Sequence, residues 1–275
     1  MQAGGGRGHR GGLVKGRVLI IAGSDSGGGA GIQADIKTVT MLGGYAATAI
    51  TAITVQNTLG VTGVVPIDPS VVEAQGRAVL DDIGADAIKT GMLGDAAMVA
   101  AVAELIDHAG RVPAVIDPVM VAKGGASLLA DEAIEAVINL LIPRAGLLTP
   151  NAPEATALTG MAINSLEGLR AAGRALMAMG AKAVLMKGAH LEGDTVTDVL
   201  LSSEGERIFA APRLQSRHTH GTGCTLASAC ATGLAQGLSM EHSVERAIDY
   251  VRTAIARAPG LGGGHGPLDH GWPLR

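Results

Sequence analysis

The chain has 275 residues and a formal net charge of −4; 47% of its residues are hydrophobic and 17% are charged. This composition can build the core of one large α/β domain or of two small ones, and it excludes a disordered chain. Aromatic residues make up only 1% of the chain and no long basic block occurs. Neither a basic face for nucleic acid nor an aromatic platform for single strands is therefore expected.

The first residues and the cysteines suggest how the chain is organised and where it functions. Residues 1–16 are rich in Gly and Arg, which predicts a flexible tail before a single domain at 17–275. No secretory signal is visible, and the uncharged segment 38–67 contains turn residues, which favours buried strands over a membrane span. Cys224 and Cys230 fall on different sides of an expected helix, so no disulfide and a reducing, cytoplasmic compartment are predicted.

The first half of the domain begins with an apolar run at residues 18–22, which predicts a strand buried on both faces. A glycine-rich loop at 23–31 leads into an expected helix over 32–42. Further strands are predicted at 46–55, 61–65, 87–89 and 114–117. Expected helices follow at about 69–82, after Asp95 as cap, and after Asp131 as cap.

The second half continues the alternation, with strands predicted at 146–149 and 183–186. Asn164 and Glu167 resemble a capping box at the start of the helix between these strands. A hairpin is expected over 198–210, and the last helix over about 240–258. Such alternation predicts a three-layer α/β/α fold with a mostly parallel central sheet.

Polar residues recur where the predicted strands end. In open parallel sheets, ligands bind beyond the carboxyl ends of the strands. The residues found there are Gly23, Ser24, Asp25, Gln56, Lys89, Met92, Asp117, Asn151, Glu154 and Lys187. A random arrangement would scatter such groups over both ends of the sheet, so this edge is the expected site.

A glycine turn, Thr219-His220-Gly221-Thr222-Gly223-Cys224, opens an Ala-rich helix. A helix start carries unpaired N–H groups and partial positive charge, and glycines let an anion approach that backbone. The same field is expected to lower the pKa of Cys224. The alternative is a tight turn with Cys224 as a small buried hydrophobe.

This inventory suits phosphoryl transfer, which depends on positioning and charge stabilisation. No Gly-Lys dipeptide occurs, so a Walker A loop is excluded, and residues 27–31 do not fit G-x-G-x-x-G. His218 and His220 could suggest a metal site, but no third ligand is close in sequence. Turn or phosphate contacts are the preferred interpretation of this pair.

Several motifs together carry a resemblance. Residues 22–35 (AGSDSGGGAGIQAD) resemble the opening of the hydroxymethylpyrimidine/phosphomethylpyrimidine kinases, thiamine-biosynthesis enzymes of the ribokinase-like superfamily. Matching motifs follow in order at 56–58 (QNT), 89–92 (KTGM), 117–120 (DPVM), 149–154 (TPNAPE), 186–188 (MKG), 219–224 (THGTGC) and 266–268 (GPL). The resemblance covers roughly residues 17–270. Ser26 departs from it, because many relatives have Pro there; it could loosen the loop.

The resemblance implies a ribokinase-like fold without the large lid of sugar kinases. It also implies ATP and Mg²⁺ as cofactors and two successive phosphorylations, first of the hydroxymethyl group of an aminopyrimidine and then of the monophosphate. The nearest alternative on the same scaffold is a pyridoxal or pyridoxine kinase. A non-catalytic pyrimidine or nucleotide sensor is a different alternative, which intact Lys187, Glu154 and Cys224 disfavour.

The resemblance also implies residue roles. Gln56 would read the pyrimidine edge, since an amide offers both a donor and an acceptor. Substrate contacts would come from Gly23, Asp35, Met92 and Val119, although Asp35 could instead contact a helix end and the others could simply pack.

The phosphates and metal would involve a second set of residues. Asn151 and Glu154 match an N-x-x-E element that orders Mg²⁺ and phosphate, and Asp117 is a second acidic candidate. Lys187 would neutralise phosphate charge. The transferred group would lie against Thr219, Gly221, Thr222 and Gly223, with Cys224 as the base of the first step. A homodimer is the expected assembly, as the commonest for soluble enzymes.

Overall fold

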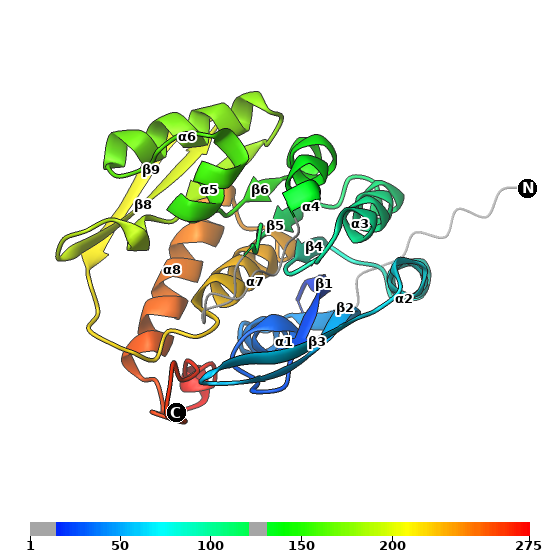
Figure 1. Ribbon diagram of the computed structural model, residues 1–275, viewed down its shortest axis with the longest axis horizontal. Helices are drawn as coiled ribbons and strands as arrows, with labels where there is room; N and C mark the ends of the chain where they lie inside the picture. The colour runs from blue at the N-terminus through cyan, green and yellow to red at the C-terminus, as the bar shows by residue number, and fades with distance from the viewer. Residues whose placement is uncertain (1–14, 121–130) are drawn as a thin grey trace, which may run out of the picture.

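A nine-stranded sheet forms the centre of the computed structural model, which describes residues 15–120 and 131–275 (Figure 1). Its order is β3-β2-β1-β4-β5-β6-β7-β8-β9. The strands are β1 (Arg17–Asp25), β2 (Tyr45–Asn57), β3 (Gly60–Pro66), β4 (Ala87–Thr90), β5 (Ala114–Ile116), β6 (Leu147–Leu148), β7 (Ala183–Met186), β8 (Thr195–Ser202) and β9 (Gly205–Pro212).

The six central strands run parallel, as predicted. The three others are antiparallel and lie at the edges: β3 pairs with β2 at one end, and β8 and β9 form a hairpin at the other. The connections from β2 to β3 and from β8 to β9 are short, which only an antiparallel arrangement allows.

Helices cover both faces of the sheet. They are α1 (Gly31–Met41), α2 (Pro69–Asp82), α3 (Ala96–Ala109), α4 (Asp131–Ala136), α5 (Ala152–Thr159), α6 (Leu166–Ala178), α7 (Thr222–Ala235) and α8 (Met240–Ala256). Helices α2 to α6 pack on one face, and α1, α7 and α8 on the other. The predicted three-layer α/β/α architecture is therefore confirmed.

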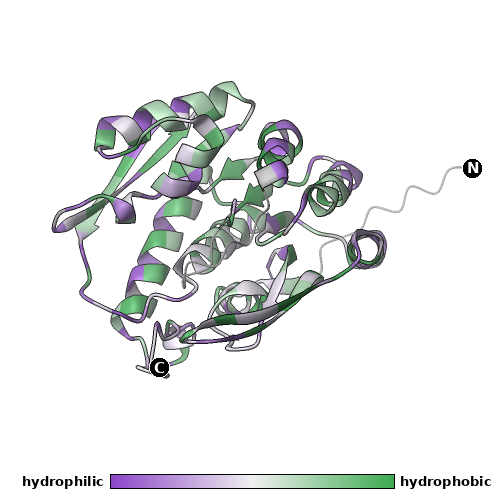
Figure 2. Cartoon of the chain, viewed as in Figure 1, coloured by the Kyte–Doolittle hydropathy of each residue, from purple (hydrophilic) through white to green (hydrophobic). Residues whose placement is uncertain are grey.

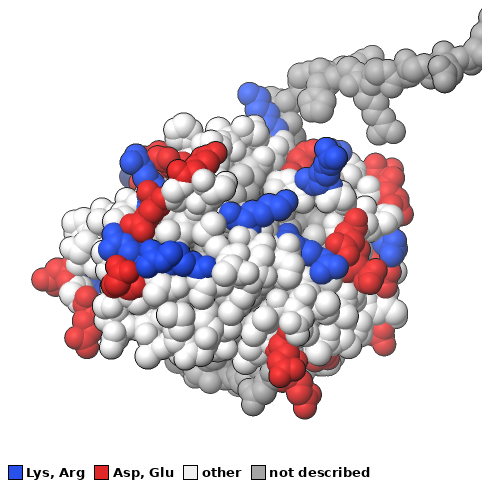
Figure 3. Space-filling model, turned by 90° about the horizontal axis from the view of Figure 1, so that it is seen from above, with Lys and Arg blue, Asp and Glu red and all other residues white. Residues whose placement is uncertain are grey.

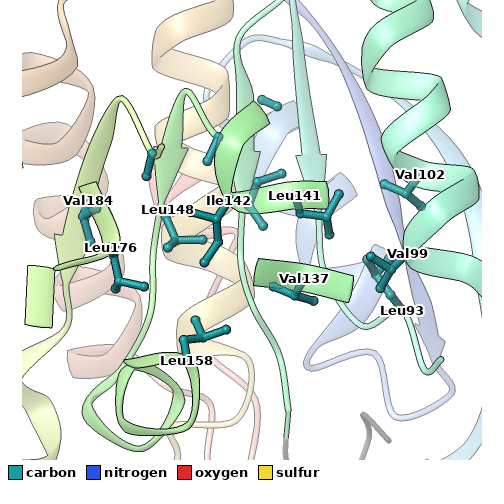
Figure 4. Packing of buried hydrophobic residues seen from close by; sticks show 14 of the residues in the cluster. Leu93, Val99, Val102, Val137, Leu141, Ile142, Leu148, Leu158, Leu176 and Val184 are labelled. Carbon is teal, nitrogen blue, oxygen red and sulfur yellow. The ribbon is translucent and has the colours of Figure 1, made fainter. Parts of the chain in front are cut away.

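Alternation along β1 explains the two cores. Leu19 and Ile21 belong to the core beneath α2 to α6, whereas Val18 and Ile20 belong to the core beneath α1, α7 and α8. Successive strand residues point to opposite faces, so a continuous apolar run serves both layers. Figure 4 shows the first of these cores, where side chains from several elements meet, among them Val99, Leu141, Leu148, Leu158 and Leu176.

Two local expectations differ from the structure. Helix α6 is capped by Ser165, whose Oγ accepts a hydrogen bond from the Gly168 N–H at 3.1 Å, and not by Asn164. Helix α4 continues as a π-helical segment (Val137–Leu141) and a 3₁₀ turn (Ile142–Arg144). Val137 and Leu141 of the π-helical segment belong to the core beneath α2 to α6.

The domain begins at the predicted strand, since β1 starts at Arg17. Lys15 and Gly16 already bond to the domain: the Lys15 N–H donates to Gly43 O, and Gly16 O accepts from the Tyr45 N–H. Lys15 and Gly16, which fall within the tail predicted at residues 1–16, therefore contact the domain in this structure. The remainder of that tail, residues 1–14, lies outside the described residues.

The distribution of hydrophobic residues along the chain agrees with this layered plan. Hydrophobic residues concentrate in the strands and on the inner sides of the helices (Figure 2). Basic and acidic side chains are interspersed on the face that Figure 3 shows. Within residues 15–120 and 131–275, no helix is long and apolar enough to cross a membrane.

Candidate active site

A cavity of about 1230 Å³ opens at the carboxyl ends of the parallel strands. Except for Asp35, the residues assigned to substrate, phosphate or metal from the sequence line it: Gly23, Gln56, Met92, Asp117, Val119, Asn151, Glu154, Lys187, Thr219, Gly221, Thr222, Gly223 and Cys224. These residues come from seven separate segments of the chain. The fold brings them together because the parallel strands all end at the same edge of the sheet.

The glycine turn lies at the start of α7, as expected. Gly221 is the residue before the helix and has φ +83°, a conformation that strongly favours glycine. A Cβ there would also collide with the carbonyl oxygen of Gly29. A Cβ on Gly223 would lie 3.4 Å from Lys187 Nζ, so the first turn of the helix directly faces that cation. This arrangement offers backbone N–H groups and an ammonium to one anion.

Lys187 joins the two acidic candidates. Its Nζ lies 3.1 Å from Asp117 Oδ1 and 3.6 Å from Glu154 Oε2. Burial acts against the charged ammonium, but the two carboxylates outweigh it and raise the pKa of Lys187. Lys187 therefore carries its charge throughout the physiological range. Asp117 is held in turn by Thr149, whose Oγ1 donates to Asp117 Oδ1 at 3.1 Å.

Asn151 and Glu154 form a capping box at the start of α5. Asn151 Oδ1 accepts from the Glu154 N–H at 2.9 Å, and Glu154 Oε2 accepts from the Asn151 N–H at 2.7 Å. Burial raises the pKa of Glu154, although nearby Lys187 opposes the rise. The capping role and a role in the cavity are compatible, because Glu154 contacts Lys187 while it caps the helix.

Cys224 lies in the cavity, but its expected activation is not seen. Burial raises the pKa of the Cys224 thiol to about 11, whereas the sequence predicts a lowered value. The charge of Lys89 and a hydrogen bond from the Gly31 N–H act in the opposite direction without overcoming burial. Desolvation of the thiol thus disfavours the thiolate form at neutral pH.

Asp35 is the one candidate that the structure places elsewhere. Its carboxylate is fully buried and accepts hydrogen bonds from Lys89 Nζ at 2.8 and 2.9 Å and from Ser228 Oγ at 2.7 Å. In this structure the Asp35 carboxylate is bound by side chains of β4 and α7, and its contact with a substrate stays a prediction. Lys89, not Asp35, lines the cavity. A lysine inside an apolar strand was the available signal that a buried counterion exists.

His220 also has a partner that the sequence did not indicate. Its Nε2 lies 2.8 Å from Asp25 Oδ2 and 3.2 Å from the Gln56 side-chain amide. Asp25 additionally accepts hydrogen bonds from the N–H groups of Gly27, Gly29 and Ala30. The described residues contain no cluster of three or more His, Cys, Asp or Glu side chains that could hold a metal. His220 thus organises the loop beside Gln56.

Ser26 does not loosen its loop. Its Oγ donates to the Gln56 carbonyl oxygen at 2.7 Å and accepts from the Gln56 N–H at 2.8 Å. The hydroxyl therefore ties the glycine-rich loop after β1 to the end of β2. Proline at this position would form neither bond.

An apolar part of the cavity lies between the β8–β9 hairpin and the last two helices. It is lined by Phe209, Leu226, Ile248, Val251 and Ile255. The sequence did not single these residues out, because each one fits the ordinary pattern of a half-buried strand or helix. Their common feature is a tertiary one: they border the cavity next to the strand that ends at Lys187.

The profile of the phosphomethylpyrimidine kinase family matches residues 25–269. The chain belongs to this family. A hydroxymethylpyrimidine/phosphomethylpyrimidine kinase of Streptomyces coelicolor is 52% identical over 257 residues, which are 94% of this chain and 95% of that protein. The resemblance drawn from the motifs is thereby confirmed, and membership of a kinase family makes this phosphomethylpyrimidine kinase homologue a phosphotransferase.

Solved structures of related kinases share the fold. A pyridoxal kinase from Staphylococcus aureus in complex with pyridoxal superposes with a TM-score of 0.87 at 36% identity, covering 94% of each chain. A phosphomethylpyrimidine kinase from Clostridium difficile gives a TM-score of 0.78 at 38% identity, covering 88% of this chain and 100% of that one. The ribokinase-like fold expected for this family member is confirmed.

Proposed function

We propose that this protein transfers phosphoryl groups from ATP to 4-amino-5-hydroxymethyl-2-methylpyrimidine and then to its monophosphate, in thiamine biosynthesis. The observation that carries the proposal is the composition of one cavity in a member of this family. Gln56, Lys187, Cys224 and the glycine turn all line that cavity, and the Gln56 amide lies 3.2 Å from His220 of the turn. An amide for a ring edge and a cationic cradle for phosphate are the two elements that such a reaction requires.

The nucleotide would occupy the part of the cavity nearest Lys187. The apolar residues between the β8–β9 hairpin and α8 suit the adenine, and the phosphates would extend toward the start of α7. Lys187 keeps its charge beside them, and the glycine turn presents backbone N–H groups to the transferred group. These groups stabilise charge in the transition state of either phosphorylation.

Asp117 and Glu154 would hold Mg²⁺, and their chemistry fits that cation. Both are buried carboxylates at the phosphate end of the cavity, and both contact Lys187. Two carboxylates suit a Mg²⁺ ion that takes its other ligands from phosphate and water. Bound there, the metal would neutralise phosphate charge as the transfer proceeds.

Cys224 is the proposed base for the first phosphorylation. Its sulfur would accept the proton of the hydroxymethyl group as that oxygen attacks the terminal phosphorus atom. With a pKa of about 11, the thiol is mostly protonated at neutral pH, so the reactive thiolate is a minor form. The second phosphorylation starts from a phosphate that is already largely ionised and does not need this base.

A pyridoxal kinase is the second candidate, because pyridoxal kinase structures superpose closely on this chain. The test is mass spectrometry of the products after incubation with ATP, Mg²⁺ and either the pyrimidine or pyridoxal. One and then two phosphoryl additions to the pyrimidine are expected. Addition to pyridoxal alone would overturn the substrate, and ATP binding without transfer to either compound would favour the sensor.

Assembly and location are further parts of the proposal. We expect a cytoplasmic homodimer, since Cys224 and Cys230 are both free and two-fold dimers are the commonest closed assemblies. Light scattering on the purified protein tests the assembly. A mass of one chain at micromolar concentration would contradict it.

A further inference from the structure

The amide of Gln56 lies between two polar side chains. Its Oε1 lies 3.1 Å from Thr54 Oγ1, and its Nε2 lies 3.2 Å from His220 Nε2. Each of these neighbours also contacts a pure acceptor. Thr54 Oγ1 lies 2.8 Å from the Ser24 carbonyl oxygen, and His220 Nε2 lies 2.8 Å from Asp25 Oδ2.

Asp25 is an acceptor because it is ionised. Burial acts to raise its pKa, but hydrogen bonds from His220 and from the N–H groups of Ala30 and Gly27 outweigh burial and lower the pKa. A carboxylate cannot donate. The contact between His220 and Asp25 therefore requires a proton on Nε2 of the imidazole.

These two acceptors determine where the protons lie. Thr54 has one hydroxyl proton, which it donates to Ser24, so toward Gln56 it can only accept. His220 Nε2–H donates to Asp25, and a nitrogen that donates cannot accept from an amide N–H. If Gln56 Nε2 lay beside His220, the amide N–H and the imidazole N–H would be two donors facing each other with no acceptor between them. Rotating the amide by 180° places Oε1 beside His220 and Nε2 beside Thr54, and both conflicts disappear.

We propose that His220, held by Asp25, and Thr54 fix the orientation of the Gln56 amide and thereby select the pyrimidine edge that the site accepts. His220 is then a positioning residue for substrate recognition. This inference rests on the function proposed above. Ser26 supports it, because its two hydrogen bonds hold the Gln56 backbone and leave only the amide to be oriented.

The fixed amide has a defined preference. Nε2 donates one N–H to Thr54 and retains the other, and Oε1, which faces a His220 N–H already donated to Asp25, keeps its lone pairs for a ligand. Gln56 thus offers an acceptor on the His220 side and a donor on the Thr54 side. A 4-aminopyrimidine has an amino donor beside a ring-nitrogen acceptor and matches this order. The 4-oxo analogue has an acceptor beside an N–H donor, so it matches only the rotated amide.

The test compares these two ligands, 4-amino-5-hydroxymethyl-2-methylpyrimidine and its 4-oxo analogue. Dissociation constants are measured by calorimetry with a non-hydrolysable ATP analogue present, and kcat and KM are measured in parallel with ATP. We expect the native protein to prefer the amino form by about 100-fold, roughly tenfold for each of two mismatched hydrogen bonds. His220→Ala should weaken binding of the amino form and strengthen binding of the oxo form, reducing the preference below about tenfold.

Two further variants separate positioning from structure. His220→Gln can supply an N–H near the position of Nε2 and should restore most of the preference. His218→Ala removes an imidazole from the same loop but does not border the cavity, so the preference should remain. If His220→Ala does not fold, Thr54→Val tests the other end of the amide and should also reduce the preference.

Equal weakening of both ligands in His220→Ala, or no preference in the native protein, would overturn the inference. The proposed function fails separately: selective binding of the amino form without phosphoryl transfer would overturn the kinase assignment and retain the role of His220. Failure to bind either pyrimidine would overturn both.

Discussion

Lys89 and Asp35 form an ion pair at 2.8 Å in which neither side chain is exposed to solvent. The pair joins the central strand β4 to helix α1, and Ser228 of α7 donates a third hydrogen bond to the same carboxylate. Lys89 also borders the cavity. The ion pair therefore borders the cavity and also holds β4 to α1, so we expect its loss to lower the stability of the domain.

Breaking this pair should destabilise the protein strongly. Lys89→Met or Asp35→Asn leaves one group without its partner, and we expect the free energy of unfolding to fall by about 3–5 kcal/mol in each variant. Denaturant titration measures this. The double variant Lys89→Met with Asp35→Asn should recover part of the loss, whereas additive losses would show that the two side chains do not depend on each other.

Lys187→Ala should reduce kcat in both phosphorylations, by roughly 10²–10³, because a charge on the transferred group loses its stabilising cation. Steady-state kinetics with the pyrimidine and with its monophosphate test this. The matched control is Lys182→Ala, an exposed lysine outside the cavity, which should retain native rates. A change in KM alone, with kcat preserved, would contradict the role assigned to Lys187.

Cys224→Ala should slow the first phosphorylation by about 10²–10⁴, the effect of a positioned base, and should affect the second much less. Cys230→Ala is the control, because Cys230 is fully buried in α7 and does not border the cavity. Separate assays of the two steps distinguish the outcomes. Equal losses in both steps would show that Cys224 is not the base that distinguishes them.

The pH dependence follows from the raised pKa of Cys224. With a pKa of about 11, the thiolate fraction grows as pH rises. The rate of the first phosphorylation should therefore increase about tenfold per unit between about pH 7 and pH 9, while the second step stays nearly flat. A pH–rate profile of kcat/KM for each substrate measures this. A plateau of the first step near neutrality would mean that the thiol ionises more easily in the working enzyme.

Gly221→Ala should disable the site, since Gly221 has φ +83° and its Cβ would meet the Gly29 carbonyl oxygen. The phosphate cradle would shift, and ATP turnover should fall at least tenfold in an activity assay. Gly237→Ala is a matched control: it has φ +82°, but its Cβ meets nothing within 4 Å. It should cost about 1–2 kcal/mol of stability and leave the rates intact. If Gly221→Ala and Gly237→Ala have similar kinetics, the glycine turn at the start of α7 does not bind the phosphate.

Much of the fold could be predicted because regular alternation is a local property. The run at residues 18–22 is apolar on both faces of a strand, and the helix over Pro69–Asp82 begins at a proline and has the length expected from its sequence. The predicted start of a helix was wrong where either of two neighbouring residues could cap it. Ser165 caps α6 although Asn164 is an equally good capping residue by type, and only the backbone conformation chooses between them.

The candidate site could be predicted for a topological reason. Parallel strands joined by helices all end at one edge, so residues as distant as Gly23 and Lys187 had to meet there. The sequence by itself therefore determined the α/β/α architecture, the location of the cavity, the glycine turn and the kinase family.

Tertiary structure alone decided the partners and the electrostatics. His220 and Asp25 lie 195 positions apart, and Lys89 and Asp35 lie 54 apart. A lysine in an apolar strand signals that a counterion exists, but the local sequence does not say which residue supplies it. The pKa of Cys224 depends first on burial and then on the charge of Lys89, and both are set by the layers packed around the thiol. Periodicity determines which face of an element is apolar, but the contacts between polar side chains depend on how those faces are seated against one another.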